Sequence, residues 1–214
     1  KALIGRINSD LANNLGNLLN RTINMIKRYH DKIVPQPTSL DEDDDLKNEF
    51  RKGISNVHRL YDDLAYNKIL ENIWLLVDTT NKYIDKNAPW NLVKSEDGKQ
   101  RLATVMYNTA ESLRIISLLI YPFMPESANT MMKQIGIETP IEEQGLQSLN
   151  TWGNLKPGTV VNPGPQLFPR IEDKEAEKIL LDIKSHDPSC KKKSLIAETE
   201  GLCDQVLIDD FMKI

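Results

Sequence analysis

Apolar side chains recur every three or four positions along several long stretches of this chain, and this spacing constrains the fold more than any other feature. Such a period places one face of a helix against a core. The first stretch predicts a long helix that ends before the double-proline loop at 34–37, because the residue before a proline disfavours helical backbone. Its buried face is expected to hold Leu3, Ile7, Leu11, Leu15, Leu18, Leu19, Ile23 and Ile26.

Further stretches of the same kind follow along the chain. They predict helices at 46–65, 66–86, 99–121 and 126–134. The hydrophobic fraction of 40% is enough for one sizeable core. Amphipathic helices joined by short links therefore predict an all-α fold, an antiparallel helix bundle.

The helical period disappears between 137 and 170, where proline and glycine punctuate the chain. A loop this long inside a compact domain usually has a function or lies against a partner. Within it, residues 159–161 and 167–168 could form short strands. A helix is expected at 172–183, then a polar linker and the beginning of a strand at 206–211. Because the chain begins without methionine and ends inside this strand, we interpret it as part of a longer protein.

The polar face of the first helix carries three asparagines and one arginine, spaced by three or four positions. Asparagine is a mediocre helix former, because its side chain competes for backbone hydrogen bonds. A compositional bias is one explanation, since the whole chain is rich in Asn, Lys and Ile. The alignment with an arginine favours a functional surface, since amides and a guanidinium can read the edges of unpaired bases. The aligned residues are Asn13, Asn17, Arg21 and Asn24.

Trp90 follows Pro89, so it lies beyond the end of the helix expected at 66–86. No periodicity demands a large apolar group there. An aromatic side chain on a rigid turn either covers a small satellite core or forms a binding surface on which a base can stack. By contrast, Trp74 falls on an apolar stripe and is expected in the core, and His58 lies close to such a stripe and is expected to pack there.

Several classes of function find no support in the sequence. The net charge of -4 argues against a general basic field for nucleic acid, so any RNA contact must be local. The two cysteines have no metal-ligand spacing and fit a reducing cytosol. No apolar run approaches the roughly 18 residues of a membrane span. Glycine-rich phosphate loops, HExxH, GxSxG and paired CxxC motifs are absent, and the acidic residues are expected in solvated runs. The residues alone indicate a helical binding or interaction module.

Four motifs carry a resemblance to a known family. Residues 6–21 closely resemble the start of the anticodon-binding helical domain of methionyl-tRNA synthetases. The segment 81–90, the proline-broken helix end at 121–125 and the closing motif at 167–171 are similar to later parts of the same domain. The first motif is shared loosely with other class I synthetases, whereas all four in this order are specific for the methionine enzymes.

The resemblance implies roles for individual residues. Asn17 and Arg21 match the pair that reads the first anticodon base, a cytosine, and Trp90 matches the aromatic on which an anticodon base stacks. Asn87 and Pro89 match the turn that presents this aromatic. Asn13 and Asn14 are expected to line the groove or to cap neighbouring backbone, and Trp152 is expected to pack. The implied partner is the anticodon stem-loop of tRNA(Met).

The resemblance also implies a larger parent enzyme, in which a catalytic domain of the same chain activates methionine with ATP and magnesium. The HIGH-like and KMSKS-like motifs of that domain are absent here, so this chain is expected to hold no catalytic residues and no cofactor. The tail resembles the start of an oligonucleotide-binding-fold tRNA-binding domain, which dimerises in the family and therefore implies a homodimeric parent. A cytoplasmic location is expected from the cysteine usage. The expected domains are the bundle at 1–136, a return segment at 137–172, a helix and linker at 173–200, and the start of the tail domain at 201–214.

Two alternatives remain open. One is the anticodon-binding domain of another class I synthetase, of the leucine or valine type, which would bind a different anticodon. The other is a helical protein-interaction module, whose surface would meet a protein instead of RNA. The pattern of Asn17, Arg21 and the residues 87–90 disfavours both alternatives.

Overall fold

The computed structural model describes residues 2–38 and 43–186, and within them the chain is helical, which confirms the all-α prediction. The β pairing in this part of the chain is an isolated antiparallel bridge between Ile33 and Val160. The described residues fall into two compact units: 2–5 with 171–186, and 6–170. The expected linker after 186 and the strand at 206–211 lie outside the described residues.

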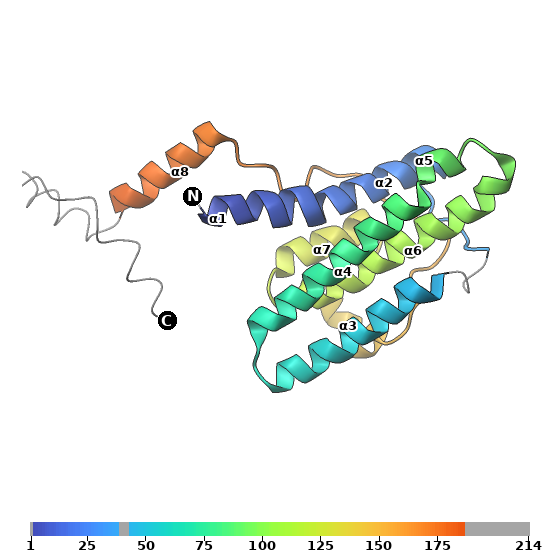
Figure 1. The fold of residues 1–214 in the computed structure, drawn as a ribbon, viewed down its shortest axis with the longest axis horizontal. Coiled ribbons are helices and arrows are strands. Elements are labelled where there is room, and N and C mark those ends of the chain that lie inside the picture. The colour runs from blue at the N-terminus through green and yellow to red at the C-terminus, as the bar shows by residue number, and fades with distance from the viewer. Residues whose placement is uncertain (1, 39–42, 187–214) are drawn as a thin grey trace, which may run out of the picture. The chain divides into compact units, whose positions relative to one another are not determined.

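The predicted helices are present. For every predicted helix except the first, the observed bounds lie within three residues of the expected ones. Figure 1 shows the order of the elements and the alternating directions of α2, α3, α4 and α6. The elements are α1 (Ala2–Arg6), the π-helix η1 (Ile7–Gly16), α2 (Asn17–Tyr29), α3 (Asp44–Asp62), α4 (Tyr66–Asn87), α5 (Pro89–Leu92), α6 (Glu96–Ile120), α7 (Pro125–Gln134), the 3-10 helices η3 (Ile141–Glu143) and η4 (Leu146–Leu149), and α8 (Asp173–His186).

Helix α6 is the centre of the larger unit and packs against α2, α4, α5 and α7 (Figure 1). Its predicted core face is buried, from Leu102 to Ile120. The burial extends around the helix to polar and charged residues, among them Glu111 and Arg114. The expectation that the acidic residues are solvated is wrong for Asp43 and Glu111, because each carboxylate is buried against an arginine of α6.

The first helix differs from the expectation, because residues 7–16 form a π-helix and α2 ends at Tyr29. In an α-helix with 3.6 residues per turn, side chains four positions apart are rotated about 40° from one another around the helix axis. The apolar residues 3, 7, 11 and 15 are spaced by four, and the wider turns of a π-helix keep such residues more nearly on one face. The stripe is buried from Leu15 onward, whereas Leu3 is 72% exposed, so its expected burial is wrong. Beyond α2, Asp31 and Lys32 have φ of 50° and 68°, which ends the helix.

The irregular segment after α7 is fastened to α6 by a buried carboxylate. The backbone N–H groups of Gly153, Asn154 and Leu155 donate to the Glu111 carboxylate at 2.8, 3.2 and 3.0 Å. Trp152 packs edge-on against Phe50 at 5.4 Å between ring centroids, in the packing role expected of it. The loop is therefore ordered by contacts with the bundle itself.

Two smaller expectations concerned single side chains. Trp74 packs against the core as predicted. His58 is exposed, so its predicted packing role is wrong. The buried residue here is Val57, and the next residue of a helix lies about 100° further around the axis, on the solvent side. No helix in the described part of the chain combines the length and apolar character that crossing a membrane requires.

Candidate nucleic-acid interface

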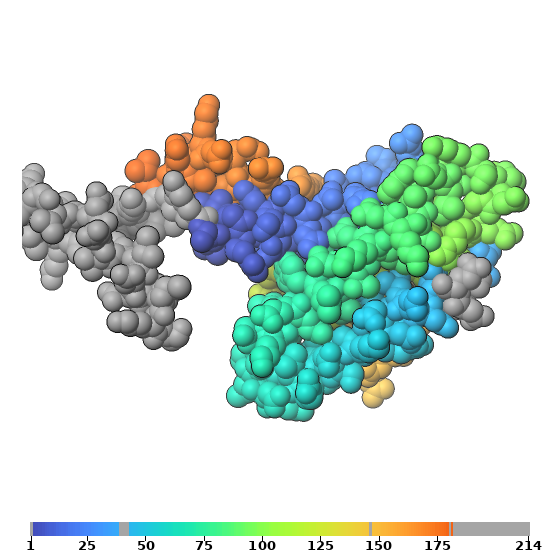
Figure 2. All heavy atoms as spheres, in the orientation of Figure 1, coloured from blue at the N-terminus to red at the C-terminus, as the bar shows by residue number. Residues whose placement is uncertain are grey.

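Two of the predicted site residues meet in the structure, although they come from separate helices. The Cζ atom of Arg21 on α2 lies 6.0 Å from the centroid of the Trp90 ring on α5, at the outer limit of a cation–π contact. The space-filling view shows α4 lying along η1 and α2, with α5 at the far end of α4 (Figure 2). A guanidinium and an indole thus share one side of the bundle.

The turn before Trp90 has an unusual backbone. Helix α4 ends at Asn87, and Ala88 takes the left-handed conformation with φ 42° and ψ 63°. A residue with a Cβ atom pays about 1–2 kcal/mol for this conformation. Pro89 then begins α5 and is buried, while Trp90 remains 41% exposed. Trp90 lies beyond α4 as predicted, in a short helix rather than in a loop.

Arg21 is held from the other side by an ion pair. Its Nη2 atom donates to Asp85 Oδ1 at 2.8 Å, and the two side chains are 29% and 62% exposed. A guanidinium has five N–H donors, and this contact uses one of its nitrogens. Arg21 therefore has a fixed orientation and retains donors for an external acceptor.

The asparagines of the first helix have different surroundings. Asn14 donates from Nδ2 to Asp78 Oδ1 at 2.7 Å and accepts at Oδ1 from Asn81 Nδ2 at 2.8 Å, so its amide ties η1 to α4. Asn13 and Asn17 are exposed, and their side chains form no hydrogen bond with another residue in 2–38 or 43–186. Their amides are accessible to a ligand, whereas that of Asn14 is engaged in the fold.

Asn87 supports the turn and does not present a free oxygen. Its Nδ2 atom donates to the carbonyl oxygen of Tyr83 at 2.9 Å. Its Oδ1 atom accepts from Arg101 Nε at 3.1 Å and from Arg101 Nη2 at 2.6 Å. These contacts give Asn87 a place in the architecture of the α4–α5 turn.

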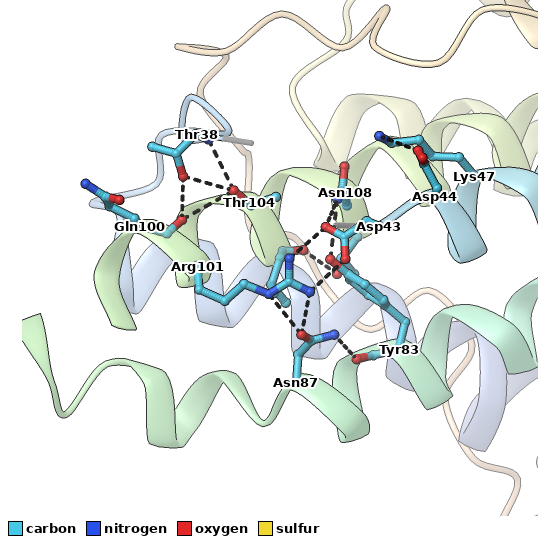
Figure 3. A network of polar contacts seen from close by, with 12 residues as sticks. Thr38, Asp43, Asp44, Lys47, Tyr83, Asn87, Gln100, Arg101, Thr104 and Asn108 are labelled. Atoms are coloured by element: carbon cyan, nitrogen blue, oxygen red, sulfur yellow. Dashed lines mark hydrogen bonds and ion pairs between the residues drawn. The ribbon is translucent and has the colours of Figure 1, made fainter. Parts of the chain in front are cut away.

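A network that no sequence pattern indicated continues from Arg101 (Figure 3). Arg101 donates to both oxygens of Asp43, at 3.0 and 2.7 Å, and Asn108 Nδ2 donates to Asp43 Oδ2 at 2.7 Å. The Trp152 Nε1 atom donates to Asn108 Oδ1 at 3.3 Å. Burial raises the pKa of the neighbouring Tyr83, so its phenol stays neutral. Asp43 and Arg101 lie 58 positions apart, which explains why neither stood out.

The other end of α5 is fixed by close packing. The Leu92 carbonyl oxygen lies so near Gly98 that a Cβ atom there would stand 2.2 Å from it. A glycine is therefore required at this position of α6. The Gly98 N–H also donates to Ser95 Oγ at 3.2 Å, which caps the start of α6.

The family model that describes the anticodon binding domain of methionyl tRNA ligase matches residues 34–183. The chain belongs to the methionyl-tRNA synthetase family. It is 44% identical over 220 residues to the methionine–tRNA ligase of Caldanaerobacter subterraneus subsp. tengcongensis, an alignment that covers 100% of this chain and 32% of that protein. The enzyme from Lactococcus lactis subsp. lactis is 39% identical over 215 residues, which cover 99% of this chain and 32% of the relative.

Solved structures of the same family share the fold. The apo Mycobacterium tuberculosis methionyl-tRNA synthetase superposes with a TM-score of 0.73 at 37% identity, covering 80% of this chain and 34% of that chain. The complex of the M. tuberculosis enzyme with methionyl-adenylate gives 0.72 at 37% identity and covers 79% and 33%. This chain spans about a third of the length of the relatives it matches. It corresponds to the anticodon-binding region of a methionyl-tRNA synthetase.

Proposed function

We propose that this chain binds the CAU anticodon of tRNA(Met), with an anticodon base stacked on Trp90 and the first base, a cytosine, read by Asn17 and Arg21. The observation that supports this proposal best is the convergence of Arg21 and Trp90 from two helices on one exposed surface. Anticodon bases are unpaired, so they can be splayed out onto such a surface.

The chemistry of the three groups suits a cytosine. Cytosine offers acceptors at O2 and N3 and a donor at N4. The Arg21 guanidinium supplies donors, and the free amide of Asn17 can donate and accept. Stacking on an aromatic ring contributes about 1–3 kcal/mol per base. Asn13 lines the same helix face, whereas Asn14, Asn87 and Pro89 act by holding the elements that present the site.

The whole protein extends this proposal. We infer that a methionyl-tRNA synthetase containing this region charges tRNA(Met) with methionine, using ATP and magnesium in a catalytic domain of the same chain. We also infer a cytoplasmic location and a homodimer formed through the C-terminal tRNA-binding domain. We retain the proposed domain bounds from the sequence: the bundle at 1–136, the return segment at 137–172, the helix and linker at 173–200, and the start of the tail domain at 201–214.

The proposed function is tested by titrating the chain with an anticodon stem-loop that carries CAU and with one that differs only at the first anticodon base. Both titrations are run at low and at physiological salt. Salt weakens the phosphate contacts of both stem-loops alike, whereas the ratio of their two dissociation constants reports the reading of the base. A clear preference for CAU is expected. Selective binding of another anticodon, or equal binding of the two stem-loops, would contradict the proposed readout of the first base, and binding of neither stem-loop would contradict the proposed function of this chain.

A further inference from the structure

We propose that Arg101 is a positioning residue for Trp90: it holds Asn87, and through Asn87 it fixes the strained turn that presents the indole. This inference rests on the proposed function, because it assigns the group that orients the proposed stacking surface. It assigns no contact between Arg101 and RNA.

The first step is the pair of hydrogen bonds by which Arg101 holds the last residue of α4. Two of its nitrogens donate to Asn87 Oδ1, at 3.1 and 2.6 Å, while Asn87 Nδ2 donates back to the Tyr83 carbonyl at 2.9 Å. Asn87 is the last residue of α4, and Ala88 directly after it has φ 42°. The guanidinium therefore fixes the residue next to a conformation that alanine adopts at a cost.

The second step is the anchor of Arg101 itself. Two further nitrogen–oxygen contacts go to the Asp43 carboxylate, whose side chain is 2% exposed. Asn108 donates to the same carboxylate from the buried surface of α6. Figure 3 shows the guanidinium between Asp43 and Asn87. Only a planar fork of N–H donors can bridge two such acceptors, and a lysine ammonium is a point charge on a flexible stem.

The third step is the shortness of α5, which runs only from Pro89 to Leu92. A single helical turn does not hold its shape alone, because nucleating a turn is unfavourable. Its position thus depends on what is attached at each end. One end is fixed by Gly98, which lets the Leu92 carbonyl approach α6, and the other end is fixed by Asn87 and Arg101.

The molecule contains a matched control for Arg101. Arg114 lies on the same helix, is buried, and forms an ion pair with Glu111 at 2.7 Å. Its contacts go to the return segment at Ser148 and Thr151, and none of the contacts described for it reaches α4 or α5. A substitution at Arg114 therefore disturbs a comparable buried pair without touching the turn.

The experiment incorporates 5-fluorotryptophan into the whole chain and records the fluorine spectrum, with the Trp90 signal assigned by its loss in Trp90→Phe. Arg101→Gln and Arg101→Lys are expected to shift or broaden the Trp90 signal, whereas Arg114→Gln leaves it in place. Arg101→Lys retains the charge beside Asp43, so it keeps the test available if Arg101→Gln does not fold. An unchanged Trp90 signal in a folded Arg101 variant would overturn the inference.

A second readout uses the CAU stem-loop. Either Arg101 variant is expected to weaken binding by about tenfold, within the range for loss of one stacked base. Added to Trp90→Ala, it is expected to cause no further loss, because both changes remove the same interaction. Losses that multiply would contradict the route through Trp90. If the wild-type chain binds no stem-loop, the proposed function fails, while the fluorine spectra still decide the positioning role.

Discussion

Two arginine–carboxylate pairs of the bundle have nearly the same shortest nitrogen–oxygen distance and very different surroundings. Arg21 and Asp85 meet at 2.8 Å with side chains that are 29% and 62% exposed. Arg114 and Glu111 meet at 2.7 Å with side chains that are 2% and 0% exposed. The buried carboxylate also accepts three backbone N–H groups, so every contact it makes is internal.

The comparison shows that burial, rather than the contact itself, decides what a charged pair does. A buried pair that loses one partner leaves an uncompensated charge in a medium that solvates it poorly. An exposed pair is solvated with or without its partner and contributes little to stability. The Glu111–Arg114 pair therefore stabilises the fold, whereas Arg21 can exchange its contacts with solvent for contacts with a ligand at a small cost in folding free energy.

The largest expected effect is on stability at the buried pair. Arg114→Ala should lower the free energy of unfolding by about 3–5 kcal/mol, because it leaves the Glu111 carboxylate buried without its guanidinium. Urea denaturation followed by circular dichroism measures the change. Arg51→Ala, at an exposed arginine of α3, is the control and should change stability little. Equal losses in the two variants would mean that burial does not separate the two kinds of pair.

The next largest effect is on RNA binding at the exposed side. Trp90→Ala should lose about 1–3 kcal/mol of binding free energy for the CAU stem-loop, because a stacking surface is removed. Leu75→Ala is the control, since Leu75 is a 54% exposed apolar residue of α4 outside the proposed site. Isothermal titration calorimetry gives both values. Wild-type affinity in the Trp90 variant would remove this residue from the site.

A smaller effect is expected on specificity. Arg21→Ala should reduce the preference for cytosine at the first anticodon position by about 1 kcal/mol, the net value of one hydrogen bond. The ratio of dissociation constants for stem-loops with different first bases measures this preference. Arg28→Ala, at an exposed arginine of the same helix, should leave the ratio unchanged. A loss in Arg21→Ala that is equal for all first bases would argue against base readout.

The smallest effect is on stability at the exposed pair. Asp85→Asn should change the free energy of unfolding by less than about 1 kcal/mol, because both partners are partly solvated. The same urea experiment that is used for Arg114→Ala measures it. A loss as large as that of Arg114→Ala would show that the pair on the surface is also structural, and the comparison would fail.

The sequence predicted the elements better than it predicted their contacts. Apolar spacing is local information, so α4 and α6 could be placed from it. The meeting of the helix bearing Arg21 with the turn bearing Trp90 followed from the family resemblance, and the geometry agrees with it. The roles of Asn14 and Asn87 could not be predicted, because their partners lie on other helices and depend on tertiary packing. The same holds for the buried carboxylate of Asp43.

The contact between the two ends of the larger unit bears on the order in which the chain folds. A Cβ atom at Gly16 would stand 2.9 Å from the Leu11 carbonyl oxygen and 3.4 Å from Phe168 Cδ2, so the start of α2 rests on a ring from the last part of the loop region. Such long-range contacts form late, because closing a long loop must precede them. During synthesis, the helix that carries Asn17 and Arg21 therefore leaves the ribosome well before Phe168, and it completes its packing only after Phe168 has been made.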